Sequence, residues 1–168
     1  MTRALGAVAL VLVLGVTGWF VRGWIWPDEQ ARVKEAVAAL ATTITEAGNA
    51  GGGLGLVEAV GALRDQVTED VTIESEERGV RIGGRDQVVA LVARVAASPN
   101  RLALAFVDVA VELDDAGTTA TVQATTQMTE TSTATGQQGF DAQQVDMTWV
   151  KQGQSWLLQS ARAIEVLR

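Results

Sequence analysis

Side chains able to do chemistry are few in this chain, because its 168 residues include no His, no Cys and no Tyr. Arginine and carboxylate side chains remain. Arg101, Glu130, Ser160 and Arg162 are predicted to fall in neighbouring rows at one end of a C-terminal sheet. Such a group could hold an anion, because guanidinium pairs well with carboxylates. The simpler interpretation, which we favour, is a set of solvated charges that contribute little energy.

A second group of carboxylates is Asp70, Glu74, Glu76 and Glu77. These residues could bind a hard cation such as calcium. Strand alternation would place neighbouring acids on opposite faces, however, and the stretch lacks the spacing of an EF-hand loop. A solvated hairpin is the better interpretation. We therefore predict no metal site and no cofactor, and the absence of Cys and His disfavours zinc.

Acid–base catalysis would need titratable groups that face each other in a cleft. Asp108 and Asp146 are predicted on the polar face of the sheet, where no pocket is evident. An enzyme that uses Glu130 or Asp146 as its base is the least favoured alternative. A Ser-His-Asp triad is excluded because the chain has no His. We predict no catalytic residue.

The elements that must position these side chains are four consecutive strands predicted in residues 101–168. Turns are predicted at 114–117, 135–139 and 152–153, where Asp, Gly and polar residues tolerate tight reversals. Pairing outward from these turns puts the apolar set on one face, because side chains alternate with a period of two. The predicted pairs are Val111 with Ala120, Val109 with Val122, Val107 with Ala124, Ala103 with Met128, Met128 with Met147, Thr126 with Trp149, Trp149 with Trp156, and Met147 with Leu158.

The apolar inner face of this sheet is the predicted site for a small apolar ligand or a lipid. The two tryptophans in the set are also typical of a packed core, which is the interpretation we favour for them. The predicted pocket residues are Thr126, Met128, Glu130, Met147, Trp149, Trp156 and Arg162.

The outer face is predicted to be rich in Thr and Gln, with an apolar strip embedded in it. Such a face suits a protein partner or a second copy of the chain. A partly solvated sheet covered by the chain's own loops is an equal alternative. The predicted contact residues are Leu104, Phe106, Thr125, Gln127, Thr148 and Val150.

Residues 4–21 are 18 residues without a charge, which is close to the length of a membrane-spanning helix. Three tryptophans gather at the far end, where indoles favour the headgroup layer. A cleaved signal peptide and a buried core helix are the alternatives. We expect an uncleaved membrane anchor within residues 1–26, with the N-terminus cytoplasmic and residues 27–168 forming one domain in the periplasm or outside the cell. A net charge of −7 makes nucleic acid a poor partner.

Between anchor and strands, helical spacing of apolar residues predicts one helix that begins near Pro27 and ends before Gly48. A second helix is predicted over 54–67, a short hairpin over 71–82, and a third helix over 85–97. The order is α-α-β-β-α-β-β-β-β. This order predicts an α+β domain of three helices packed on a curved, mainly antiparallel sheet.

Three segments resemble the nuclear transport factor 2-like superfamily, which includes SnoaL-like and ketosteroid-isomerase-like proteins. They are residues 63–74 (LRDQVTEDVTIE), 83–86 (GGRD) and 153–158 (GQSWLL). The resemblance implies a cone-shaped fold with a pocket at its open end. Members of the superfamily include isomerases, dehydratases, and binding or assembly modules. The Tyr that serves as oxyanion donor in ketosteroid-isomerase-like members has no counterpart in this chain.

Together these observations predict a membrane-tethered, non-enzymatic binding or assembly module that acts outside the cytoplasm. It would act by protein contact or self-association through the outer sheet face, with another protein or a second copy as its partner. The alternative is a binder of a small apolar ligand in the cone pocket, and an enzyme is the third option.

Overall fold

The computed structural model describes residues 28–75 and 79–164. The predicted anchor, residues 4–21, lies outside this part. Within the described ranges, no helix is long and apolar enough to cross a membrane.

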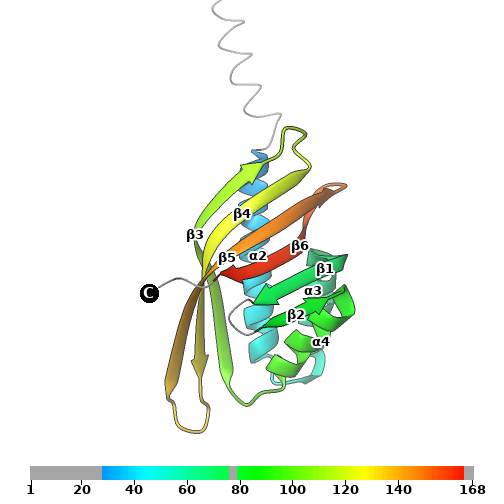
Figure 1. Cartoon of the computed structure of the whole chain (residues 1–168). Helices are drawn as coiled ribbons and strands as arrows, with labels where there is room; N and C mark the ends of the chain where they lie inside the picture. The colour runs from blue at the N-terminus through cyan, green and yellow to red at the C-terminus, as the bar shows by residue number, and fades with distance from the viewer. Residues whose placement is uncertain (1–27, 76–78, 165–168) are drawn as a thin grey trace, which may run out of the picture.

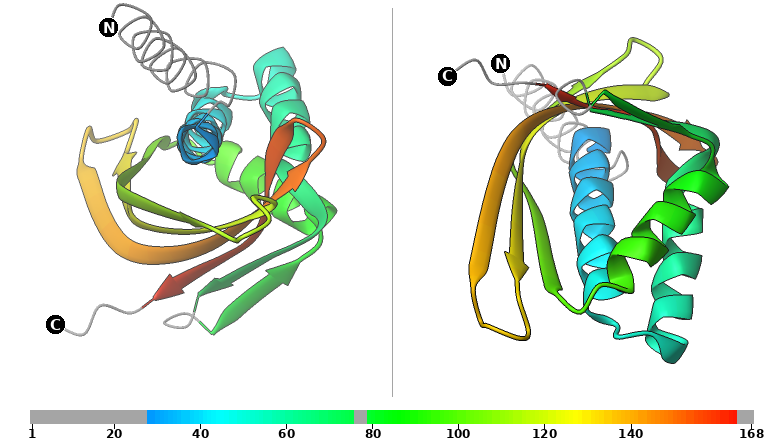
Figure 2. Two further views of the ribbon diagram at one scale, coloured as in Figure 1. Left: turned by 90° about the horizontal axis from the view of Figure 1, so that it is seen from above. Right: turned by 60° about the horizontal axis from the view of Figure 1, so that its bottom comes forward.

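The central element is helix α2, which spans Glu29–Asn49 (Figure 1). Asp28 caps its first turn by accepting a hydrogen bond from the backbone N–H of Gln30 at 3.0 Å. Val33, Val37 and Leu40 recur at helical spacing and are buried. The curved sheet wraps one side of α2, while α3 and α4 cover another (Figure 2).

The end of α2 differs from the prediction, which stopped the helix before Gly48. The helix continues through Gly48 and Asn49 because it packs closely on the sheet there. A Cβ on Gly48 would lie 2.8 Å from the Leu102 Cβ, so glycine permits the close approach of helix and strand. The Asn49 Nδ2 then donates to the Leu102 carbonyl oxygen at 2.6 Å.

Two shorter helices complete the helical layer. Helix α3 spans Gly53–Gln66 and runs directly into strand β1, Val67–Ser75. Strand β2 spans Val80–Gly83, and helix α4 spans Arg85–Ala96. These elements agree with the predicted order, although β1 begins four residues before the predicted strand.

The four C-terminal strands are β3 Arg101–Leu113, β4 Thr119–Thr131, β5 Gln138–Gln152 and β6 Ser155–Ile164. All six strands of the described chain form one sheet in the order β2-β1-β6-β5-β4-β3. Every neighbouring pair is antiparallel except β1 and β6, which are parallel. The predicted α+β class, with three helices on a curved, mainly antiparallel sheet, is confirmed.

The predicted turns were displaced, and this changed the pairing. Asp114 closes the β3–β4 turn with Thr119, and its carboxylate accepts from the backbone N–H of Thr118 and Thr119 at 2.7 and 3.0 Å. Those hydrogen bonds hold the pKa of Asp114 below its ordinary value. Near the turn the register is therefore shifted by two residues, with Val111 opposite Val122. An even shift keeps the same face inward.

The other two hairpins show the same behaviour. The β4–β5 turn closes where the backbone N–H of Ser132 donates to the Gln137 carbonyl oxygen at 2.9 Å, and its centre lies about three residues before the predicted one. Met147 therefore lies opposite Val122 rather than Met128. Beside the β5–β6 turn, Trp149 lies opposite Leu158 rather than Trp156. Both shifts are even, so the predicted inner set on β4 and β5 stays inward.

Strand β3 contains an irregularity that the prediction missed. Val107 lies opposite Thr125 and Ala110 opposite Gln123, so Asp108 and Val109 together face one residue of β4. This is a β-bulge, and Asp108 has a positive φ of 54°. An extra residue reverses which side chains point inward on the remainder of the strand. Leu104 and Phe106 were predicted on the outer face and instead lie on the inner one.

The bulge can be tested at Asp108, because a positive φ is unfavourable for residues other than Gly, Asn and Asp. We expect Asp108→Val to lower the free energy of unfolding by ~1–2 kcal/mol and Asp108→Gly to preserve it or raise it slightly. Urea denaturation of the full chain measures both. The control is Glu112→Val on the same strand, which should change stability little. If Asp108→Val and Glu112→Val lowered the free energy of unfolding equally, the assignment of the β-bulge to Asp108 would be contradicted.

Candidate functional site

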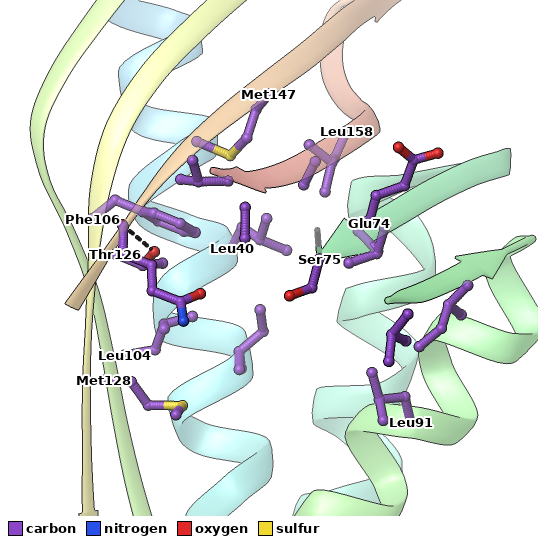
Figure 3. Close-up of a pocket in the computed structure, with 18 of the residues that line it drawn as sticks. Leu40, Glu74, Ser75, Leu91, Leu104, Phe106, Thr126, Met128, Met147 and Leu158 are labelled. Carbon is purple, nitrogen blue, oxygen red and sulfur yellow. Dashed lines mark hydrogen bonds between the residues drawn. The ribbon is translucent and has the colours of Figure 1, made fainter. Parts of the chain in front are cut away.

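A cavity of about 480 Å³ opens between the concave face of the sheet and helices α2 and α4. This volume is typical of small-molecule sites. All six strands and two helices contribute to its walls, and most of the side chains are apolar (Figure 3). The lining residues are Leu40, Ile44, Ile73, Glu74, Ser75, Val80, Ile82, Leu91, Leu104, Phe106, Thr126, Met128, Asp141, Gln143, Val145, Met147, Leu158, Ala161 and Ala163.

The cavity is closed at one end and more accessible at the other. On β5, burial decreases along one face from Trp149 and Met147, through Val145, to Gln143 and Asp141, which are half-buried. Strand β4 shows the same gradient, from the buried residues beside the hairpin to the half-buried Thr126 and Met128. The floor of the cavity is therefore apolar, and its polar groups lie toward the mouth.

Few polar atoms face the cavity. The Thr126 hydroxyl donates to the backbone carbonyl oxygen of Gln143 at 2.8 Å (Figure 3). The Ser75 hydroxyl points into the cavity, whereas the Glu74 carboxylate is directed away from Ser75 (Figure 3). Glu74 is paired with the Arg81 guanidinium at 3.0 Å. The other polar side chains among the described lining residues are Asp141 and Gln143.

Three of the predicted pocket residues, Thr126, Met128 and Met147, line this cavity. Trp149 and Trp156 do not, because both are buried in the core at the closed end of the cone. This placement agrees with the core interpretation favoured for them from sequence.

Glu130 and Arg162 also fall outside the cavity lining. Glu130 is exposed beyond Met128, where it accepts a hydrogen bond from Asn100 Nδ2 at 2.6 Å. Arg162 was predicted inward, but the β5–β6 register shifts between Thr148 and Trp149, leaving Gln159 as an extra residue on β6. Beyond Gln159, the side chains of β6 therefore point to the opposite faces from those predicted. Arg162 lies on the outer face, opposite Glu74 on β1 and Asp146 on β5.

The predicted anion-binding group is therefore not assembled. Ser160 lies opposite Thr148 on the outer face, while Glu130 belongs to the inner face of β4. The row through Arg81, Glu74, Arg162 and Asp146 instead alternates positive and negative charges across four neighbouring strands. Opposite charges in directly facing positions stabilise a sheet modestly. In the part of the chain that the structure describes, no three acidic, His or Cys side chains form a metal-binding group.

Of the predicted contact residues, Thr125, Gln127, Thr148 and Val150 lie on the outer face as expected, whereas Leu104 and Phe106 line the cavity. Sequence reasoning missed the contributions of β1 and the far end of β6. Ile73 lies opposite Ala161 and Ser75 opposite Ala163, so these residues share the inner face. No local sequence signal shows that β1 and the far end of β6 share the inner face, because their placement depends on parallel pairing between distant segments and on a bulge.

The comparisons with known proteins agree with this geometry. The SnoaL-like domain family matches residues 58–162. The chain belongs to the SnoaL-like domain family. Among curated proteins, no sequence match to the chain was found.

Solved structures show the same fold at low sequence identity. A nuclear transport factor 2-like superfamily protein from Salmonella enterica is 12% identical, with a TM-score of 0.66 over 83% of this chain and 92% of that one. A protein of unknown function from Mycobacterium tuberculosis is 21% identical, with a TM-score of 0.64 over 86% and 79%. The protein Aln2 from a Streptomyces species is 16% identical, with a TM-score of 0.65 over 82% and 91%. The SnoaL-like chain therefore has the nuclear transport factor 2-like cone fold.

At the closed end of this SnoaL-like cone, Glu29 joins helix α2 to the β5–β6 hairpin. Its carboxylate accepts from Lys151 Nζ at 2.9 Å, Trp156 Nε1 at 3.0 Å and Arg32 at 3.1 Å. Arg32 also donates to the carbonyl oxygen of Gln154. The Lys151 hydrogen bond is the main cause that lowers the pKa of Glu29, and partial burial opposes it. The contacts by which Glu29 ties the helix to the hairpin are therefore strongest when its carboxylate is ionised.

Because the pKa of Glu29 is lowered on folding, its contribution to stability is present above the unfolded pKa and is lost as pH falls through the folded value. We expect Glu29→Gln to lower the free energy of unfolding by ~1 kcal/mol at pH 7. The difference from the unsubstituted chain should shrink below about pH 4. Urea titrations at several pH values measure it. The control is Glu35→Gln, at an exposed site on the same helix. If Glu35→Gln lowered the free energy of unfolding as much as Glu29→Gln, the stabilising role given to Glu29 would be refuted.

Proposed function

We propose that this SnoaL-like domain binds a small, mostly apolar ligand in the cone cavity without transforming it. The observation that carries the proposal is the cavity itself, about 480 Å³ in volume with mainly aliphatic, aromatic and thioether walls. The sequence had favoured contact through the outer sheet face. Two apolar residues on which that idea rested, Leu104 and Phe106, lie on the cavity side and support ligand binding instead.

The chemistry of the lining favours binding over catalysis. Acid–base catalysis requires an acid and a base that meet at one reacting group. Among the described residues that line the cavity there are two acids, and one of them, Glu74, is paired with Arg81 and directed away from Ser75 (Figure 3). The two residues that the sequence offered as bases, Glu130 and Asp146, do not contribute to the lining. We therefore assign no catalytic residue.

We further propose that residues 4–21 tether the domain to a membrane, with the domain outside the cytoplasm. The support is the uncharged length of this segment and the tryptophans that follow it. A tethered binding domain would meet apolar ligands as they leave or enter the bilayer, where such molecules are most concentrated.

Filling the cavity with a larger side chain tests ligand binding. Ala163 lines the cavity opposite Ser75, so Ala163→Phe should lower the affinity for a neutral solvatochromic dye, N-phenyl-1-naphthylamine, at least tenfold. The physical reason is that the new ring occupies the ligand's volume. The measurement is dye fluorescence with the full chain in nanodiscs, with empty nanodiscs as the blank.

The matched control is Ala142→Phe, which adds the same ring to an exposed position of β5 on the outer face. It should leave the dye affinity within twofold of the unsubstituted chain. The cavity proposal would be contradicted if Ala163→Phe and Ala142→Phe both lost dye binding. It would also be contradicted if the unsubstituted chain showed no saturable dye binding. Circular dichroism verifies that both variants remain folded.

Self-association through the outer sheet face is the second candidate, and one observation favours it. Phe140 is 67% exposed on that face. Its neighbours across β4 and β3 are Thr129 and Ala103, so the ring stands among small, uncharged side chains. An exposed aromatic ring in such a setting is typical of an interface anchor. We commit to a second copy of the chain as its partner.

For this candidate we expect the full chain to remain in the membrane pellet after a high-salt wash and to form a cross-linked dimer there. Phe140→Asp should reduce the dimer at least fivefold, because it places a charge in the centre of the contact. Leu54→Asp, at a residue 82% exposed on α3, is the control and should not change it. A chain released by high salt would contradict the tether, and an undiminished dimer would contradict the interface.

A further inference from the structure

We infer that the cavity continues outward as an apolar strip on α4, formed by Leu91 and Val95, and that the ligand is a long aliphatic chain whose outer part lies on this strip. This inference rests on the proposed function and adds the length and flexibility of the ligand. It is carried by the side of α4 on which the two residues lie and by their exposure.

Leu91 belongs both to the cavity and to the surface. It lines the cavity and is 37% exposed. It projects from α4 on one side of the cavity, and Met128 projects from β4 on the other (Figure 3). A ligand that passes Leu91 can therefore leave the cavity without losing contact with an apolar side chain.

Val95 extends this contact along the helix. Residues four apart lie on the same side of a helix, so Val95 follows Leu91 at a rise of roughly 6 Å along α4. The Val95 side chain is 42% exposed. The buried residues of α4 are Val88, Val89 and Ala96, so the helix packs against the domain without full burial of Leu91 or Val95.

The direction from Leu91 to Val95 is toward the mouth. Helix α4 ends one residue after Val95, and the connection that follows is held at the accessible end of β4. There, Asn100 Nδ2 donates to the Glu130 carboxylate at 2.6 Å, and Glu130 lies beyond Met128 on β4. The strip therefore begins in the cavity wall and runs out past the mouth.

Continuity with the cavity distinguishes this strip from ordinary exposed side chains. Single apolar residues on a surface are common and need no ligand. Here Leu91 is shared between the cavity wall and the strip, so one ligand can cover both. Covering the strip removes the Leu91 and Val95 side chains and the ligand's own methylenes from water, which favours binding.

The size of the cavity sets the chain length that reaches the strip. At roughly 30 Å³ for a group the size of a water molecule or a methylene, a cavity of about 480 Å³ holds at most roughly 16 such groups. An eight-carbon chain fits inside, whereas an eighteen-carbon chain extends beyond the mouth. A chain of single bonds can also bend at Leu91, which a rigid fused-ring system cannot do.

Octan-1-ol and octadecan-1-ol test the inference, because they share a head group and differ in chain length. Their affinities follow from displacement of N-phenyl-1-naphthylamine from the full chain in neutral-lipid nanodiscs, corrected for the dye affinity of each variant. Variants are compared in identical nanodiscs, so partition of the alcohol into lipid cancels. We expect Val95→Asp to lower the affinity for octadecan-1-ol at least fivefold and to leave that for octan-1-ol within twofold, because only the longer chain reaches the strip. Val95→Ile keeps the strip apolar and should leave both affinities within twofold.

The matched control is Ala90→Asp, which adds the same carboxylate at an exposed position on another face of α4 and should leave both affinities within twofold. If Val95→Asp weakens the two alcohols equally or weakens neither, or if Ala90→Asp reproduces its effect, the inference is overturned while the proposed function stands. The same conclusion follows if the dye binds and neither alcohol displaces it. If the unsubstituted chain shows no saturable dye binding, the proposed function falls and the inference falls with it.

Discussion

Helix α2 packs in the hollow of the curved sheet, and the rest of the structure depends on that contact. Its buried residues Val33, Val37 and Leu40 belong to one cluster with Trp149 and Val122 on the concave face of the sheet. Each such side chain contributes roughly 1.5–3 kcal/mol when it is fully removed from water. The helix occupies the hollow of the sheet, and Gly48 lets the last turn of the helix approach the edge strand. The cavity is the part of the hollow that α2 does not fill.

Two β-bulges decide which side chains of β3 and β6 face the cavity. The one at Asp108 turns Leu104 and Phe106 inward, and the one at Gln159 turns Ala161 and Ala163 inward and Arg162 outward. Beyond each bulge, the side chains that would have pointed outward point inward, and the reverse, because the inserted residue shifts the alternation by one position. The apolar residues that β3 and the far end of β6 add to the cavity wall therefore follow from these two local irregularities.

The distribution of charge is consistent with this arrangement. Cationic side chains of β2 and β6 face acids on the outer surface, where Arg81 pairs with Glu74. Asp141 faces the cavity instead. At the opposite end of the cone, Glu29 is surrounded by Lys151, Trp156 and Arg32 and holds the start of α2. The closed end is thus fixed by an ion pair and a tryptophan core, while Asp141 and Gln143 lie toward the open end.

The sequence by itself determined the element order, the helices, the four C-terminal strands and the apolar face of β4 and β5. These features are local: helical spacing, alternation and turn residues act over a few positions, and errors of an even number of residues in a turn leave the inner face unchanged. The same locality explains why Met128 and Met147 line the cavity as predicted. Trp149 was also named as a pocket residue, and it lies in the core instead, as the favoured interpretation of the tryptophans had it. Only the tertiary structure decided the sides of Leu104, Phe106 and Arg162, the parallel pairing of β1 with β6, and the approach of Asp141 to Ser75 and Met128 around one cavity. A bulge is stabilised by the packing of a whole sheet, and parallel pairing joins segments that are distant in sequence, so neither leaves a signal within a short stretch of chain.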